Sequence, residues 1–102
     1  RSTIETLPSI ADAVGDSMEV YLDSGIRRGM DVLKALALGA RAVLIGRPLF
    51  WGLAVDGEAG VRAALEILRT EFDRAMAYCG RTRVSQLDRS LANLPCACWT
   101  RR

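Results

Sequence analysis

Glycine and arginine occur together at two points in the sequence, each directly after a short apolar stretch. The first turn is DSGIRRG at residues 23–29, and the second turn is GRP at residues 46–48. Glycine lets a ligand approach the main chain closely, and arginine supplies a forked donor that matches phosphate oxygens. A helix that begins at such a turn adds free backbone N–H groups and a partial positive charge. The two turns therefore predict a phosphate site, for a substrate phosphate or for the phosphate of a cofactor.

Helices and strands alternate around the two turns. The apolar stretches at residues 20–22 and 42–45 predict short strands, and the second has no polar alternation, which is typical of a strand covered on both faces. Apolar periodicity predicts helices near residues 3–14, 30–38, 48–55, 58–79 and 84–94. Ser2 and Glu5 have the spacing of a capping box, but Pro8 favours a main helix that begins near Leu7. Gly39 and Gly80 are expected just after the ends of their helices.

The order of these elements predicts an α/β fold. A helix between the two strands requires the strands to be parallel, and two parallel strands do not make a stable sheet alone. We therefore expect residues 1–87 to be the C-terminal part, the last two βα units, of a (β/α)8 barrel, followed by a tail at residues 88–102. In such barrels the loops after the last two strands, with a short extra helix, often bind phosphate. Residues 48–55 suit that extra helix.

Four further side chains near the turns have narrower predicted roles. Asp23 follows a strand, and we expect it to hold a loop amide or orient an arginine rather than to act as a base. Of the adjacent arginines, only Arg27 is expected to face a ligand, which leaves Arg28 on the surface or in an ion pair. Phe50 and Trp51 are expected to pack in a core or at a subunit contact.

Composition excludes several other classes of protein. The chain has 102 residues and a net charge of +2, which predicts one domain at most and no nucleic-acid surface. It has no apolar run long enough for a membrane span and no secretory signal pattern, so we expect a cytoplasmic protein. The chain contains no histidine and only Cys79, Cys96 and Cys98 as thiols. Ordinary reduced thiols are therefore expected rather than a metal site.

The stretch DSGIRRGMDVLKALALGARAVLIGRPLFWGLAVDGEAGV, residues 23–61, resembles the C-terminal part of the FMN-dependent α-hydroxy-acid oxidase and dehydrogenase family. The resemblance extends from about residue 2 to about residue 87. It implies a (β/α)8 barrel in which both turns hold the FMN phosphate. The residues that it assigns to cofactor binding are Asp23, Ser24, Gly25, Ile26, Arg27, Gly46 and Arg47.

The resemblance also implies a function for the full-length protein, namely oxidation of a small 2-hydroxy acid to a 2-oxo acid. Oxygen or another acceptor would take the electrons, and the protein would be a homotetramer or larger. The family's catalytic histidine is absent, so no catalytic residue is assigned here and the segment alone is expected to be inactive. Two alternatives stay open. One is another phosphate-binding barrel, an isomerase or an enzyme like IMP dehydrogenase, and the other is a non-catalytic truncated module.

Overall fold

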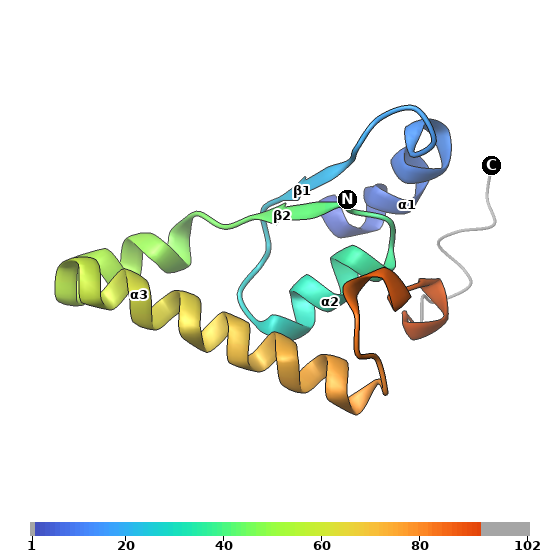
Figure 1. The fold of residues 1–102 in the computed structure, drawn as a ribbon. Coiled ribbons are helices and arrows are strands. Elements are labelled where there is room, and N and C mark those ends of the chain that lie inside the picture. Colours follow the sequence, from blue (N-terminus) through green and yellow to red (C-terminus); the bar gives the residue numbers. More distant parts are fainter. Residues whose placement is uncertain (1, 93–102) are drawn as a thin grey trace.

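The computed structural model describes residues 2–92 and has an α/β architecture (Figure 1). The two thiols Cys96 and Cys98 and most of the predicted tail lie outside the described residues. In chain order the elements are α1 (Thr3–Val14), β1 (Tyr21–Asp23), α2 (Gly29–Ala37), β2 (Ala42–Leu44), α3 (Arg47–Tyr78), and the 3₁₀ turns η1 (Val84–Gln86) and η2 (Arg89–Leu91).

Helix α1 begins at Thr3, so the prediction of a main helix that begins near Leu7 is wrong. The predicted capping box explains the early start. The backbone N–H of Ser2 donates to a carboxylate oxygen of Glu5 at 3.0 Å, which stabilises the first turn. Pro8 lies inside the helix and is buried together with Leu7. Burial of this apolar pair offsets the hydrogen bond that a proline cannot donate.

Strands β1 and β2 form a two-stranded parallel sheet, as the connecting helix predicted. Helix α2 makes that connection and ends as expected. Gly39 has φ +109°, its N–H donates to the carbonyl of Leu36 at 3.1 Å, and the N–H of Ala40 donates to the carbonyl of Ala35 at 3.0 Å. This pair of hydrogen bonds is the Schellman motif, which places the chain for its turn into β2.

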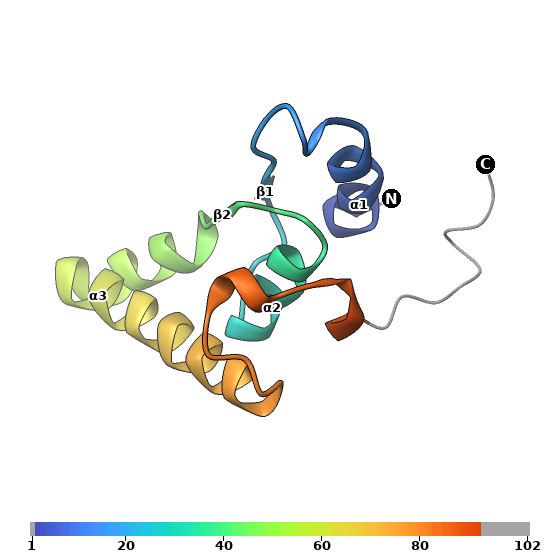
Figure 2. The same ribbon diagram turned by 45° about the vertical axis from the view of Figure 1, so that its right-hand side comes forward.

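Helix α2 lies between the sheet and α3 and is buried on both sides (Figures 1 and 2). One apolar cluster joins it to α1, β1 and the first turn, through Leu7, Leu22, Ile26, Ala35, Leu38 and Ala40. A second cluster joins α2 to α3, through Leu33, Ala75 and Met76. Strand β2 is only half-buried, and 52% of Leu44 is exposed. Residues 2–92 do not cover both faces of β2, because one helix layer and one neighbouring strand cannot enclose it, so the expected cover stays a prediction for the full-length protein.

Helix α3 consists of two helical segments that meet at Asp56 and Gly57, whose backbone angles are not helical. This is where the sequence predicted a break between two helices. After the break the chain folds back on itself (Figure 1). Gly52 and Gly60 touch there, because a Cβ on Gly52 would come within 2.5 Å of the Gly60 carbonyl oxygen. The second segment ends at the Cys79 cap, and Gly80 follows with φ +65°, as predicted.

The predicted last helix is replaced by the two 3₁₀ turns η1 and η2. Side chains compete with the backbone here, since Gln86 accepts from the N–H groups of Thr82 and Arg83, and Asp88 accepts from that of Ser90. Arg89 then donates to Asp12 of α1 at 2.5 Å and keeps the pKa of that carboxyl below its ordinary value. The segment that carries η2 thus contacts α1.

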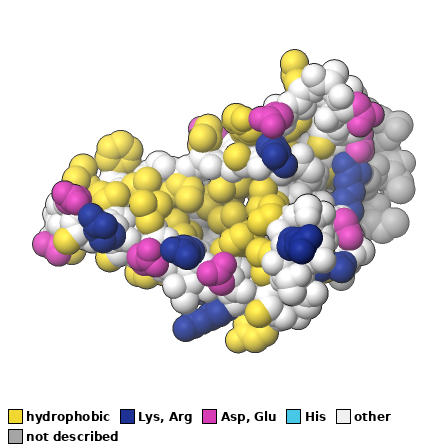
Figure 3. Space-filling view, in the orientation of Figure 1, with side chains coloured by type: hydrophobic (Ala, Val, Ile, Leu, Met, Phe, Trp, Pro, Cys, Tyr) yellow, Lys and Arg dark blue, Asp and Glu magenta, His cyan; other side chains and the backbone are white. Residues whose placement is uncertain are grey.

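Many large apolar side chains are exposed, and hydrophobic atoms cover much of the face seen in Figure 3. They include Tyr21, Leu44, Phe50, Trp51, Leu53, Val55, Leu65, Ile67 and Tyr78. A stable monomer rarely leaves so much apolar surface in contact with water. No helix in residues 2–92 is long and apolar enough to cross a membrane.

Candidate functional site

The two turns lie at the same end of the parallel sheet, where the carboxyl ends of both strands meet. Tyr21 pairs with Ala42 and Asp23 pairs with Leu44, so both strands end side by side. Neighbouring strands lie about 4.8 Å apart. The first turn follows β1 and the second turn follows β2 at this common carboxyl-terminal end of the sheet. This is the arrangement that the sequence predicted.

Asp23 holds a loop amide in the first turn. Its carboxylate accepts a hydrogen bond from the N–H of Ser24 at 2.8 Å, as expected for this residue. Ser24 and Gly25 both have positive φ, +79° and +84°. The Ser24 carbonyl also accepts a hydrogen bond from the Thr3 hydroxyl, at 3.4 Å. These contacts turn the chain sharply away from β1 and leave space beside Gly25, where an added Cβ would meet nothing within 4 Å.

Carboxylates within the chain occupy the start of α2. Asp31 accepts from the N–H groups of Arg27 and Arg28 at 3.0 and 2.9 Å. Glu71 of α3 accepts from the N–H of Gly29 at 2.9 Å. The expectation that this helix start presents free N–H groups to a ligand is therefore wrong for residues 27–29, because acidic side chains satisfy those donors first.

The two carboxylates differ in how readily the sequence reveals them. An acidic residue in the first turn of a helix is a common cap, so Asp31 could have been found from its place near Arg28. Glu71 follows Gly29 by 42 residues, and no local signal connects them.

Gly29 is required for helix packing rather than for a ligand. A Cβ at this position would collide with the backbone of Glu71 and Phe72 on α3. The sequence predicted a close approach at Gly29, and the structure shows that α3 makes it. This contact places Glu71 within reach of the first turn.

Arg27 reaches from the first turn to the first segment of α3. Its Nη1 donates to the carbonyl of Ile26 at 2.9 Å, and its guanidinium carbon lies 5.3 Å from the centre of the Trp51 ring. Trp51 and Phe50 are 55% and 68% exposed, so neither packs in the core of residues 2–92, and the alternative prediction of a subunit contact stays open. Arg28 is exposed, and no ion pair involves it in the described part of the chain.

The second turn leaves its donors free. Gly46 is the cap of α3, Arg47 is the first helical residue, and Pro48 is the second rather than the first as predicted. The Gly46 carbonyl accepts from the N–H of Leu49 at 3.0 Å. Within residues 2–92, no hydrogen bond occupies the N–H groups of Gly46 and Arg47, and no ion pair occupies the Arg47 side chain. Open space lies beside Gly46.

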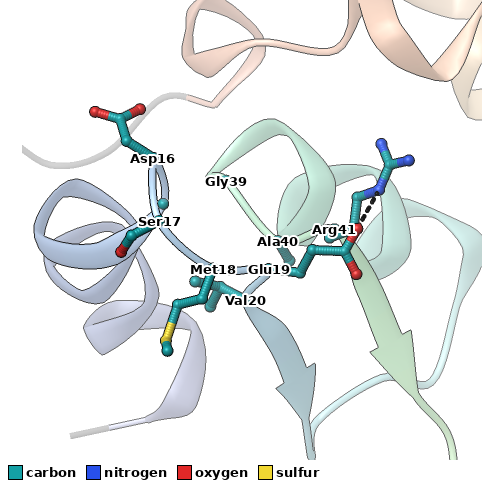
Figure 4. Close-up of a pocket in the computed structure, with 9 residues that line it drawn as sticks. Asp16, Ser17, Met18, Glu19, Val20, Gly39, Ala40 and Arg41 are labelled. Atoms are coloured by element: carbon teal, nitrogen blue, oxygen red, sulfur yellow. Dashed lines mark ion pairs between the residues drawn. The ribbon is translucent and has the colours of Figure 1, made fainter.

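A shallow pocket of about 420 Å³ lies at the opposite end of the sheet, before the strands begin (Figure 4). An exposed ion pair between Glu19 and Arg41, 3.4 Å apart, crosses its rim. Glu19 also accepts from the Tyr21 hydroxyl at 2.6 Å and raises the pKa of that phenol. None of the predicted phosphate residues lines this pocket. No cluster of metal-binding side chains occurs among residues 2–92.

The sequence matches the family described as FMN-dependent dehydrogenase over residues 1–94. It is 56% identical over 90 residues to 2-hydroxyacid oxidase 1 of Mus musculus, a match that covers 88% of this chain and 24% of that protein. It is also 56% identical over 86 residues to the pre-mycofactocin synthase of Mycolicibacterium smegmatis, with 84% of this chain and 22% of that protein covered. The chain thus spans about a quarter of the length of the relatives that it matches.

The fold is also found in solved structures. A mandelate oxidase variant carrying a monooxide FMN adduct superimposes with a TM-score of 0.81 and 51% sequence identity. The match covers 84% of this chain and 27% of the mandelate oxidase chain. Most of this chain therefore has a structural counterpart in about a quarter of a larger protein.

Proposed function

Since the chain belongs to the FMN-dependent dehydrogenase family, we propose that its two turns bind the phosphate of FMN in an enzyme that oxidises 2-hydroxy acids. The observation that carries the proposal is the free helix start at Gly46 and Arg47, at the same sheet edge as Arg27. The residues proposed to form the phosphate site, by direct contact or by holding the turns in place, are those assigned from the sequence, namely Asp23, Ser24, Gly25, Ile26, Arg27, Gly46 and Arg47.

The donors at this edge fit a phosphate dianion. Backbone N–H groups at a helix start and two guanidinium groups are the usual partners of phosphate oxygens. The open space beside Gly25 and Gly46 allows an oxygen to approach the main chain at both turns. Asp23 would act indirectly, since its carboxylate holds the Ser24 amide and would repel a phosphate if it faced one.

In this proposal the chain supplies the last two βα units of a (β/α)8 barrel in the full-length protein. The parallel strands, the helical crossover and the exposed apolar surface support this placement. The boundary after residue 87 stays a prediction, and so do the cytoplasmic location, the electron acceptor and the assembly into a tetramer or larger oligomer.

FMN, when bound, supplies the two-electron oxidant that converts a 2-hydroxy acid to a 2-oxo acid. The role of this chain is to anchor the cofactor. The family resemblance implies a histidine as the catalytic base, and the sequence contains no histidine, so none of its residues is assigned that role. The family match does not favour an isomerase barrel. The chain is 56% identical both to an oxidase and to a pre-mycofactocin synthase, so these matches do not identify the substrate. In this proposal, other parts of the protein select it.

A titration of the full-length apoprotein with FMN, followed by flavin fluorescence, tests this proposal. We expect a yellow holoenzyme, reduction of its flavin by 2-hydroxy acids, and a loss of about 2 kcal/mol in FMN binding for Arg47→Ala, about thirtyfold in Kd. Failure to bind FMN, or unchanged affinity in Arg47→Ala, would overturn the phosphate assignment.

A chimera separates this chain from the rest of its protein. Residues 3–92 would replace the matching segment of the mouse oxidase, to which they are similar along almost their whole length. We expect the chimera to bind FMN and to lose affinity when Arg47 is replaced. A chimera that folds but no longer binds FMN would show that these residues cannot hold the cofactor.

A further inference from the structure

We propose that Trp51 is a positioning residue that holds the Arg27 guanidinium in place for the phosphate. This inference rests on the proposed FMN site and adds to it a residue that does not itself contact the cofactor. The sequence suggested only packing for Trp51, but 55% of this side chain is exposed and its ring faces Arg27.

Two contacts restrict the Arg27 side chain. Nη1 donates to the carbonyl of Ile26, which belongs to a residue that is only 3% exposed and packed in the core cluster beneath the first turn. The Trp51 ring lies 5.3 Å from the guanidinium carbon, within the range of a cation–π interaction. A long, exposed arginine otherwise loses rotamer entropy when it binds a ligand, and these contacts remove part of that cost in advance.

The Arg27 guanidinium keeps most of its donors for a ligand. It has five N–H groups, and the carbonyl of Ile26 accepts from Nη1 alone. The Trp51 ring offers its face and accepts no ordinary hydrogen bond from the guanidinium edge. A guanidinium held in this way is oriented while its remaining donors stay available to phosphate oxygens.

Trp51 also joins the two halves of the proposed site. It lies on the first segment of α3, four residues after Arg47, so it is rigidly connected to the helix start that carries the free N–H groups. The Arg27–Trp51 contact therefore fixes the first turn relative to the second turn. Glu71 also reaches the first turn from α3, but it lies beyond the break at Asp56 and Gly57, on the second helical segment.

Paired titrations with FMN and riboflavin test the inference on the full-length protein. Riboflavin lacks the phosphate, so it reports on the rest of the flavin site. We expect Trp51→Leu to weaken FMN binding about fivefold and Trp51→Phe about twofold, with riboflavin affinity unchanged in both. Phe50→Leu is the matched control, since Phe50 is the neighbouring exposed aromatic residue and is expected to leave both affinities unchanged.

A double-mutant cycle then identifies the residue through which Trp51 acts. In an Arg27→Ala background, Trp51→Leu is expected to have no further effect on FMN affinity. An equal loss of affinity for FMN and for riboflavin would overturn the inference, and so would additive effects of the two substitutions on FMN affinity. Either result would leave Trp51 with a packing role. Melting temperatures of each variant show whether unfolding contributes, and Trp51→Phe keeps the test valid if Trp51→Leu is unstable.

The results also separate this inference from the proposed function. If Arg27→Ala weakens FMN binding but Trp51→Leu does not, the FMN site stands and the positioning role of Trp51 is wrong. If the wild-type protein does not bind FMN, or if Arg27→Ala has no effect, the proposed site fails and the inference fails with it.

Discussion

The two turns look alike in the sequence, yet the structure gives them different donors. In the first turn, Asp31 and Glu71 use up the N–H groups of Arg27, Arg28 and Gly29. In the second turn, the N–H groups of Gly46 and Arg47 have no acceptor within residues 2–92. At its helix start the first turn thus offers the Arg27 side chain but not the N–H groups of residues 27–29, whereas the helix start of the second turn offers both main-chain N–H groups and the Arg47 side chain.

The difference shows that a glycine, an arginine and a helix start do not by themselves make an anion site. The N–H groups at a helix start bind a ligand only if no closer carboxylate accepts from them. The first turn is built into the packing of α2 against α3, and its acidic caps are part of that packing. The second turn lies at the exposed end of α3.

The largest expected effect comes from a methyl group at Gly29. Gly29→Ala places a Cβ against the backbone of α3, and we expect it to lower the free energy of unfolding by about 3 kcal/mol. Gly46→Ala is the matched control in the second turn, where a Cβ meets open space, and we expect a change within about 0.5 kcal/mol. Denaturant unfolding of the full-length protein measures both. Similar losses in the two variants would contradict the contrast between the turns.

A smaller effect is expected from the cap that α3 provides to α2. Glu71→Ala leaves the Gly29 N–H without its acceptor, and we expect a loss of about 1 kcal/mol in the free energy of unfolding. Glu71→Gln keeps an oxygen acceptor, so we expect it to lower the free energy of unfolding by less than Glu71→Ala does. FMN titration of the two variants sharpens the comparison. Tighter FMN binding in Glu71→Ala than in Glu71→Gln would mean that the released N–H reaches the phosphate, contrary to the roles assigned here.

The smallest effect is expected at Arg28. This side chain is exposed and forms no ion pair within residues 2–92, so Arg28→Ala should change FMN affinity less than about twofold. Arg27→Ala in the same turn should weaken FMN binding about as much as Arg47→Ala does. The measurement is again the Kd for FMN. Equal losses for Arg27→Ala and Arg28→Ala would show that the first turn acts through its net charge rather than through one oriented guanidinium.

Much of the fold could be predicted because its signals are local. The capping box at Ser2 and Glu5, the end of α2 at Gly39 and the break at Asp56 and Gly57 all depend on residues within a few positions of one another. The last segment was mispredicted as a helix because Gln86 and Asp88 bind nearby backbone groups.

Within the candidate site, the sequence by itself determined that Arg27, Gly46 and Arg47 follow two parallel strands, since a strand, a turn and a helix are encoded by neighbouring residues. Only the tertiary structure decided which donors stay free. Glu71 and Trp51 reach the first turn through the packing of α3, 42 residues after Gly29 in one case and 24 residues after Arg27 in the other. The physical reason is that satisfying a helix start and restraining an arginine depend on distance in space, which local spacing does not encode.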